Sequence, residues 1–94
     1  MPSLNSTDLR AALADMNGWV SNPPAITRTY TCASFMEAMA FANRVAAYAE
    51  SQDHHPDLLI SYKKVTVTWS THSEGGVTEK DLAGAKATDA AFTP

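Results

Sequence analysis

All three histidines of this 94-residue chain fall within one short segment, together with two carboxylates at fixed spacings. The segment is written Glu50-x3-His54-His55-Pro56-x5-Tyr62-x9-His72-x8-Asp81. Imidazole has an unperturbed pKa of about 6.5, so a histidine both donates and accepts protons near neutral pH. A lone surface histidine often has no task, but three in one segment favour a site of proton transfer.

A metal site is the first alternative, because histidine and carboxylate are ligands of zinc. Consecutive residues of an extended segment point to opposite sides, so His54 and His55 would not converge on one ion. The helical His-x3-His pair is missing, and the single cysteine, Cys32, lies outside the segment. We therefore expect no bound metal.

Nucleophilic catalysis is the second alternative, because hydroxyl groups flank His72. Ser70, Thr71 and Ser73 lack the Gly-x-Ser-x-Gly turn that exposes a nucleophilic serine on a strained elbow. We expect Ser70 and Thr71 instead to line a polar rim where they hydrogen-bond a ligand.

The two carboxylates and the tyrosine each have a plain structural interpretation beside the functional one. If a helix continues as far as His54, Glu50 lies one turn back and orients the imidazole, or forms an ordinary helix-end pair. Asp81 follows Thr78 by three positions, which is the spacing of a capping box at a helix start. Tyr62 is interpreted as a strand aromatic that covers the edge of the core. The residues alone leave these alternatives open.

Helices and strands that position these residues follow from hydrophobic periodicity and from turn residues. Asn5, Ser6 and Thr7 are cap candidates for a first helix over 8–14, and Gly18 ends it. Two strands flank the Asn22-Pro23-Pro24 turn, the second over 26–31. The pattern then predicts a long helix from Ser34 to about 52–53, strands over 58–62 and 64–71, and a helix over 78–91.

Apolar residues within these elements indicate which faces are buried. The long helix has a stripe at three- and four-residue spacing, formed by Phe35, Met39, Ala42, Val45, Ala46 and Ala49. In the strand over 64–71, Val65, Val67 and Trp69 alternate with polar residues, and His72 falls on the polar face or its rim. Paired strands between helices predict an α+β single-domain sandwich over 1–94, a four-stranded antiparallel sheet with helices on one face, in the order α-β-β-α-β-β-α.

Composition limits the classes of partner. A net charge of -3 offers no basic field for a phosphate backbone, so we expect no direct nucleic-acid binding. No run of about 18 apolar residues exists, and the first five residues resemble no signal peptide, so we expect a cytoplasmic protein without membrane attachment. A domain of this size buries only about 60–65% of the surface of its unfolded chain, so it is marginally stable alone and self-association is an expectation.

The histidine segment resembles the signature of the pterin-4a-carbinolamine dehydratases, small proteins also described as dimerisation cofactors of a homeodomain transcription factor. All seven positions of the motif fit at the family's spacings, and the runs 53–56, 70–72 and 75–80 with Asp81 fit as well. Gly18-Trp19 and the run 41–46 are similar to the family's pattern, so the resemblance covers most of the chain. Leu58 and Leu59 depart from it, because aromatic residues are frequent there in the family.

The resemblance implies dehydration of 4a-hydroxytetrahydrobiopterin to quinonoid dihydropterin, within tetrahydrobiopterin recycling and without a cofactor. Hydroxide leaves C4a poorly, so an acid must protonate it while a base removes the N5 proton, and histidine suits both roles. By this resemblance His54 and His72 are the acid-base pair, in an order that stays open. The remaining implied residues are His55 for positioning the pterin, Glu50 or Asp81 for tuning the imidazoles, Pro56 for fixing the loop, and Ser70, Thr71 and Ser73 for binding the pterin's polar edge.

The same resemblance also implies a second class of function, a non-catalytic module for protein interaction, assembly or transcriptional coactivation. The intact set of His54, His55 and His72 favours the enzyme, because a scaffold has no physical need for it. A homodimer or homotetramer is expected in either case, with an exposed strand edge over 64–70 pairing with its twin.

Overall fold

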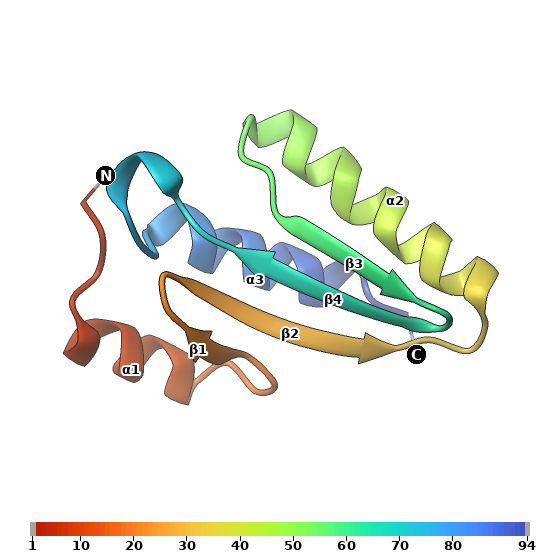
Figure 1. Cartoon of the computed structure of the whole chain (residues 1–94), viewed down its shortest axis with the longest axis horizontal. Coiled ribbons are helices and arrows are strands. Elements are labelled where there is room, and N and C mark those ends of the chain that lie inside the picture. Colours follow the sequence, from red (N-terminus) through yellow and green to blue (C-terminus); the bar gives the residue numbers. More distant parts are fainter. Residues whose placement is uncertain (1, 94) are drawn as a thin grey trace.

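The computed structural model describes residues 2–93 (Figure 1). It confirms the expected order of helices and strands. The elements are α1 (Ser6–Ala14), β1 (Val20–Asn22), β2 (Ala25–Thr31), α2 (Phe35–Gln52), β3 (Asp57–Ser61), β4 (Lys64–Trp69), the short 3-10 turn η1 (His72–Glu74) and α3 (Glu79–Ala91). Asn5 caps α1 by accepting from the Asp8 N–H, and Ser34 caps α2 by accepting from the Glu37 N–H.

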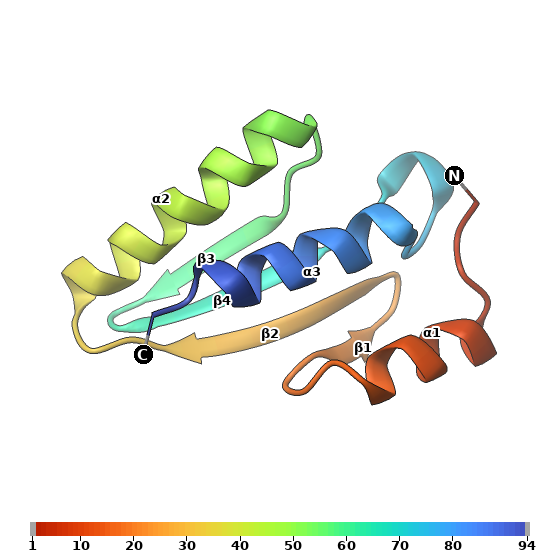
Figure 2. The same cartoon turned by 180° about the vertical axis from the view of Figure 1, so that it is seen from behind.

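The four strands form one antiparallel sheet in the order β1-β2-β4-β3. Helices α2 and α3 cover one face of it, and α1 lies beside β1 (Figures 1 and 2). This arrangement confirms the predicted α+β sandwich. The expectation of an exposed edge over 64–70 is wrong, because β4 lies between β2 and β3, and the two edge strands are β1 and β3.

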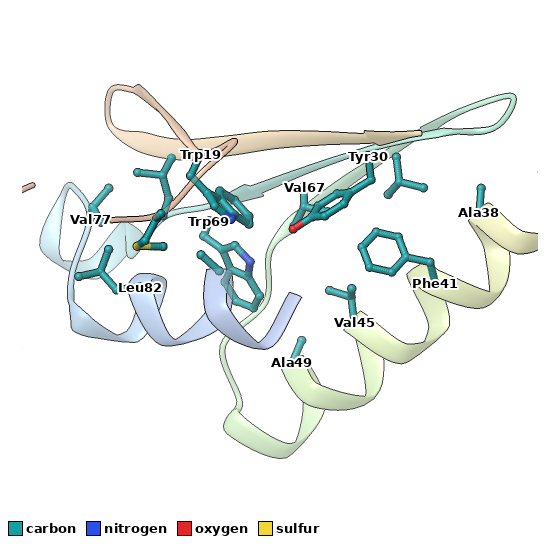
Figure 3. Close-up of a cluster of buried hydrophobic side chains, with 14 of the residues drawn as sticks. Trp19, Tyr30, Ala38, Phe41, Val45, Ala49, Val67, Trp69, Val77 and Leu82 are labelled. Carbon is teal, nitrogen blue, oxygen red and sulfur yellow. The ribbon is translucent and has the colours of Figure 1, made fainter. Parts of the chain in front are cut away.

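The core fills the space between the sheet and the two covering helices (Figure 3). Val65, Val67 and Trp69 are fully buried, as their alternation in the sequence predicts. Trp69 donates from Nε1 to the Thr88 hydroxyl of α3 over 3.1 Å. A Cβ atom added at Gly84 would lie 2.7 Å from the Trp69 ring, so the absence of a side chain there lets α3 approach the end of β4.

The buried face of α2 differs from the predicted stripe. Its buried residues are Ala38, Phe41, Ala42, Val45 and Ala49. Phe35 is 47% exposed, Ala46 is exposed and Met39 is only partly buried, so the apolar stripe overestimated what one sheet face can cover. Several large apolar side chains remain on the surface: Val20, Phe35, Met36, Leu59 and Tyr62.

The hairpin between β3 and β4 also corrects two expectations. Ser61 pairs with Lys64, so only Tyr62 and Lys63 connect the strands, and Tyr62 takes a left-handed conformation with φ of 57°. Tyr62 is 77% exposed and covers no core edge, because the tight turn directs it away from the sheet. Strand β4 ends at Trp69 rather than Thr71, since Thr71 already forms an isolated bridge with Gly76.

Helix α3 is also joined to β2 by a carboxylate that accepts three different donors. Asp89 accepts from the Trp19 indole at 3.1 Å, from the Arg28 guanidinium at 2.8 Å and from the Tyr30 hydroxyl. Burial and the hydrogen bond to Asp89 raise the pKa of Tyr30 well above its ordinary value, so the Tyr30 hydroxyl stays protonated and continues to donate. Within residues 2–93, no helix has the length and apolar character needed to cross a bilayer.

Candidate functional site

The predicted site begins where α2 ends. Asp53 takes a left-handed conformation with φ of 49°, and the His54 N–H returns to the Ala49 carbonyl at 3.2 Å. The helix therefore stops before His54, and the expected pairing of Glu50 with His54 is wrong. Glu50 instead accepts from His55, with 2.6 Å between Oε1 and Nε2, and both side chains are largely open to water.

His54 pairs with Asp81, a residue 27 positions further along the chain. The His54 Nε2 atom lies 2.6 Å from Asp81 Oδ1, and the side chains are 14% and 0% exposed respectively. The His54 ring stacks on Trp69, with 5.4 Å between the ring centroids and 26° between their planes. The fully buried end of β4 thus supports one face of the imidazole, while the first turn of α3 holds its Nε2 atom.

Asp81 has the capping duty that its spacing from Thr78 predicts. Its Oδ2 atom accepts from the Thr78 N–H at 2.8 Å, and the Thr78 hydroxyl accepts from the Lys80 N–H at 3.2 Å, which completes the capping box. Oδ2 also accepts from the Thr71 hydroxyl at 2.7 Å. The structural and the functional interpretations of Asp81 are therefore compatible, because one oxygen caps the helix while the other holds His54.

His72 lies in η1, on a loop whose two ends are joined. The Thr71 N–H donates to the Gly76 carbonyl at 3.0 Å, and the Gly76 N–H returns to the Thr71 carbonyl at 3.4 Å. The His72 side chain is exposed and makes no hydrogen bond to the rest of the described chain. This loop and the connection from α2 to β3 lie at the same end of the sheet (Figures 1 and 2).

The remaining predicted binding residues differ in how available they are. Ser70 donates its hydroxyl to the Pro24 carbonyl at 3.1 Å, and Thr71 is buried with its hydroxyl engaged by Asp81. Ser73 is exposed, and Pro56 is partly buried at the start of β3. The expected polar rim therefore offers one exposed hydroxyl, Ser73, while the Thr71 hydroxyl faces inward.

Two cavities border this region. One of about 90 Å³ reaches His54 from the side of α2 and α3, and its lining is Tyr48, Gln52, His54, Lys80 and Ala83. This volume is below the roughly 300–1,000 Å³ of typical ligand pockets. The second, of about 300 Å³, lies beyond Gly75 and Gly76 toward α1 and includes no histidine.

Sequence reasoning missed two contributors to the site. The alternation of the strand identifies Trp69 only as a core residue, although the His54 ring also stacks on it. The hydroxyl groups beside His72 predict that Thr71 lies on the rim, although it is buried and bonded to Asp81. The capping-box spacing indicates that Asp81 lies at a helix start, but no local pattern reports its partner in a distant segment. Within residues 2–93, no three histidine, cysteine or acidic side chains are grouped so that they could hold a metal ion.

Comparisons with known proteins agree with the resemblance seen in the motif. The family model described as pterin 4 alpha carbinolamine dehydratase matches residues 2–91. A relative from Thermomicrobium roseum is 43% identical over 86 residues, which is 92% of each chain, and one from Herpetosiphon aurantiacus is 44% identical over 92 residues, covering 98% of this chain and 96% of the relative. Both bear the name "Putative pterin-4-alpha-carbinolamine dehydratase".

Two solved structures are similar to this one. The transcriptional coactivator/pterin dehydratase from Brucella melitensis superposes with a TM-score of 0.92 at 38% identity, covering 97% of this chain and 99% of the other. A pterin dehydratase-like protein described as a RuBisCO assembly factor in the alpha-carboxysome gives a TM-score of 0.65 at 23% identity, covering 78% and 84%. The second likeness shows the fold alone.

Proposed function

This chain belongs to the pterin-4a-carbinolamine dehydratase family, and from that premise we propose that it dehydrates 4a-hydroxytetrahydrobiopterin by general acid-base catalysis with histidines. The observation that carries the proposal is the His54 imidazole held by a fully buried carboxylate, Asp81. A charge at that depth is costly unless it is paired and hydrogen-bonded, and here the carboxylate is directed at an imidazole.

The arrangement leaves one nitrogen of His54 available for chemistry. Nε2 is engaged by Asp81, whereas Nδ1 has no hydrogen-bond partner among residues 2–93. Because no buried polar side-chain atom in that range is left unpaired, Nδ1 is reachable from outside the protein. One ring protonates the C4a hydroxyl and the other accepts the N5 proton, with His54 and His72 as this pair. Water and the quinonoid dihydropterin are the products.

The other residues of the site have supporting roles in this proposal. His55, oriented by Glu50, positions the pterin at the exposed surface, and Pro56 fixes the direction of the chain between His55 and β3. Ser73 and the backbone of 70–73 offer hydrogen bonds to the polar edge of the pterin. The reaction uses no further cofactor and belongs to tetrahydrobiopterin recycling in the cytoplasm by a homodimer or homotetramer.

A direct assay tests the proposal. The purified protein is given 4a-hydroxytetrahydrobiopterin, and dehydration is followed by absorbance for wild type, His54→Ala and His72→Ala. Each substitution is expected to lower kcat/KM about 10²–10⁴-fold, which is the usual contribution of general acid-base catalysis. Wild-type protein no faster than buffer would refute the activity, and both variants within about threefold of wild type would refute the assignment of the histidines.

A second candidate is a module for protein interaction or assembly. The 38% identical relative is described as both a coactivator and a dehydratase, and this chain exposes large apolar side chains at Met36, Leu59 and Tyr62. Such a module would keep its partner after His54→Ala and His72→Ala, because neither ring would touch it. Co-purification of one defined partner with both histidine variants, together with an inactive wild type, is the result that favours this candidate.

A further inference from the structure

We propose that Thr71 is a positioning residue that couples the His54 imidazole to the loop bearing His72 through Asp81. This inference rests on the proposed dehydration for its kinetic consequence, although the hydrogen bonds behind it do not. Thr71 is buried, and its hydroxyl is bonded to Asp81 and Thr78 and not to a histidine ring, so we argue that its effect on the reaction passes through Asp81.

The direction of each hydrogen bond follows from the number of protons available. The Thr71 hydroxyl has one proton, which it donates to Asp81 Oδ2 at 2.7 Å. Its 2.8 Å contact with the Thr78 hydroxyl must then be a bond in which Thr78 donates and Thr71 accepts. The Thr78 hydroxyl in turn accepts from the Lys80 N–H at 3.2 Å. Both threonine hydroxyls therefore donate in the direction of the carboxylate, Thr78 to Thr71 and Thr71 to Asp81.

These hydrogen bonds determine which oxygen of Asp81 bonds the His54 ring. Oδ2 already accepts from the Thr71 hydroxyl and from the Thr78 N–H, so Oδ1 is the oxygen left for the imidazole. A carboxylate oxygen accepts hydrogen bonds, so Oδ1 accepts from the Nε2–H of the imidazole, just as Oδ2 accepts from its own two donors. The neutral His54 ring is therefore the tautomer with its proton on Nε2 and its lone pair on the accessible Nδ1 atom.

Thr71 also fixes the other half of the site. Its backbone N–H and carbonyl both bond Gly76, and this bridge closes the loop in which His72 directly follows Thr71. The backbone of Thr71 thus holds the two ends of the His72 loop together. Its side chain, through Asp81, holds the orientation of the His54 ring. Since misplacement of a catalytic group by about 1 Å costs on the order of 10²-fold, this link matters for the rate.

Two substitutions separate the hydroxyl from the shape of the side chain. Thr71→Val keeps the volume and β-branching but removes the donor to Asp81, whereas Thr71→Ser keeps the hydroxyl. We expect Thr71→Val to lower kcat about 10- to 100-fold with KM changed less than about threefold, which is the scale of losing one hydrogen bond to a charged group. Thr71→Ser is expected to stay within about threefold of wild type.

The tautomer of His54 provides a measurement that needs no substrate. Nitrogen-15 chemical shifts distinguish a protonated from a bare ring nitrogen, and the chain has three histidines, so His55→Ala and His72→Ala assign the His54 signals. We expect the neutral wild-type ring to carry its proton on Nε2, and Thr71→Val to increase the tautomer protonated on Nδ1. Thr71→Ser should keep the wild-type signals.

The outcomes separate this inference from the proposed activity. An inactive wild type that still shows the Nε2–H tautomer and its loss in Thr71→Val would refute the dehydration and support the positioning role. An active wild type whose His54 is protonated on Nδ1, or a valine variant as fast as the serine variant, would overturn the inference. If Thr71→Val does not fold, the tautomer of wild-type His54 is the remaining test. A proton on Nδ1 of the neutral ring would overturn the inference, and a proton on Nε2 would support it.

Discussion

At the scale of single residues, two histidine-carboxylate pairs have the same nitrogen-to-oxygen distance of 2.6 Å but differ in their access to water. Asp81 is 0% exposed, whereas the Glu50 side chain is 77% exposed. Water screens an exposed pair, which contributes about 0–1 kcal/mol, while breaking a buried pair leaves an uncompensated group. We therefore expect Asp81→Asn to lower kcat/KM about 10²–10⁴-fold and Glu50→Gln to lower it less than about fivefold, in the same dehydration assay.

The control for this comparison is the stability of each variant, because Asp81 also caps α3. Urea denaturation of Asp81→Asn should show a folded protein whose loss of activity exceeds any loss of native population at the assay temperature. Thr78→Ala weakens the same cap without removing the carboxylate, at a cost of about 0.5–2 kcal/mol. Equal losses of activity in Asp81→Asn and Glu50→Gln would show that burial does not distinguish the two pairs.

The sequence identifies which residues make up the candidate site, but it does not identify the pairs that they form. The spacing from Thr78 identified the capping role of Asp81, because a capping box is a contact within one turn of helix. The bond between His54 and Asp81 joins segments 27 residues apart, and the helix end at Asp53 redirects Glu50 to His55. Both facts depend on tertiary packing, which local periodicity does not report.

At the scale of elements, the contact between α3 and β4 positions the surface on which His54 stacks. Replacing an exposed helical glycine by alanine usually stabilises a protein by about 0.4–1 kcal/mol. At Gly84 the added Cβ would lie 2.7 Å from the Trp69 ring, so we expect Gly84→Ala to lower the free energy of unfolding by about 1–3 kcal/mol, as overpacking does. Urea denaturation monitored by circular dichroism measures this change.

The exposed neighbour Ala83 supplies the matched control on α3. Ala83→Gly should cost about 1 kcal/mol through helix propensity alone, with no overpacking. The informative quantity is the sign of the change in the free energy of unfolding on Gly84→Ala. The higher helix propensity of alanine would raise this free energy, whereas overpacking against Trp69 would lower it. Should Gly84→Ala raise the free energy of unfolding, α3 would not approach Trp69 as closely as the structure indicates. Sequence patterns predicted α3 but could not predict this close approach, which depends on a contact with another element.

At the scale of the whole molecule, the layered fold was predictable because it depends on the order and periodicity of elements. Alternation over Val65, Val67 and Trp69 correctly indicated one buried sheet face, and the paired strands indicated an antiparallel sheet. The order of strands was not predictable in the same way, because the sequence does not indicate which strand of the β3-β4 hairpin pairs with β2. That uncertainty produced the wrong expectation that the segment over 64–70 is an edge.

The actual edge strand β3 provides the test of self-association. Leu59 is 65% exposed on β3, and an unpaired strand edge with apolar side chains favours pairing with another chain. We expect light scattering at micromolar concentration to give at least twice the 10.1 kDa chain mass for wild type, and Leu59→Lys to shift the protein toward monomer. A charge on an edge strand opposes such pairing.

Thr29→Lys is the matched control, because Thr29 and Leu59 both pair with Thr66 and so lie in one row on the same face of the sheet. Thr29 is exposed but belongs to β2, two strands inward from the β3 edge, or about 10 Å at the usual strand spacing. Association through β3 predicts that Thr29→Lys keeps the wild-type mass while Leu59→Lys loses it. A wild type that scatters as a single chain, or equal effects of the two lysines, would remove β3 as the interface.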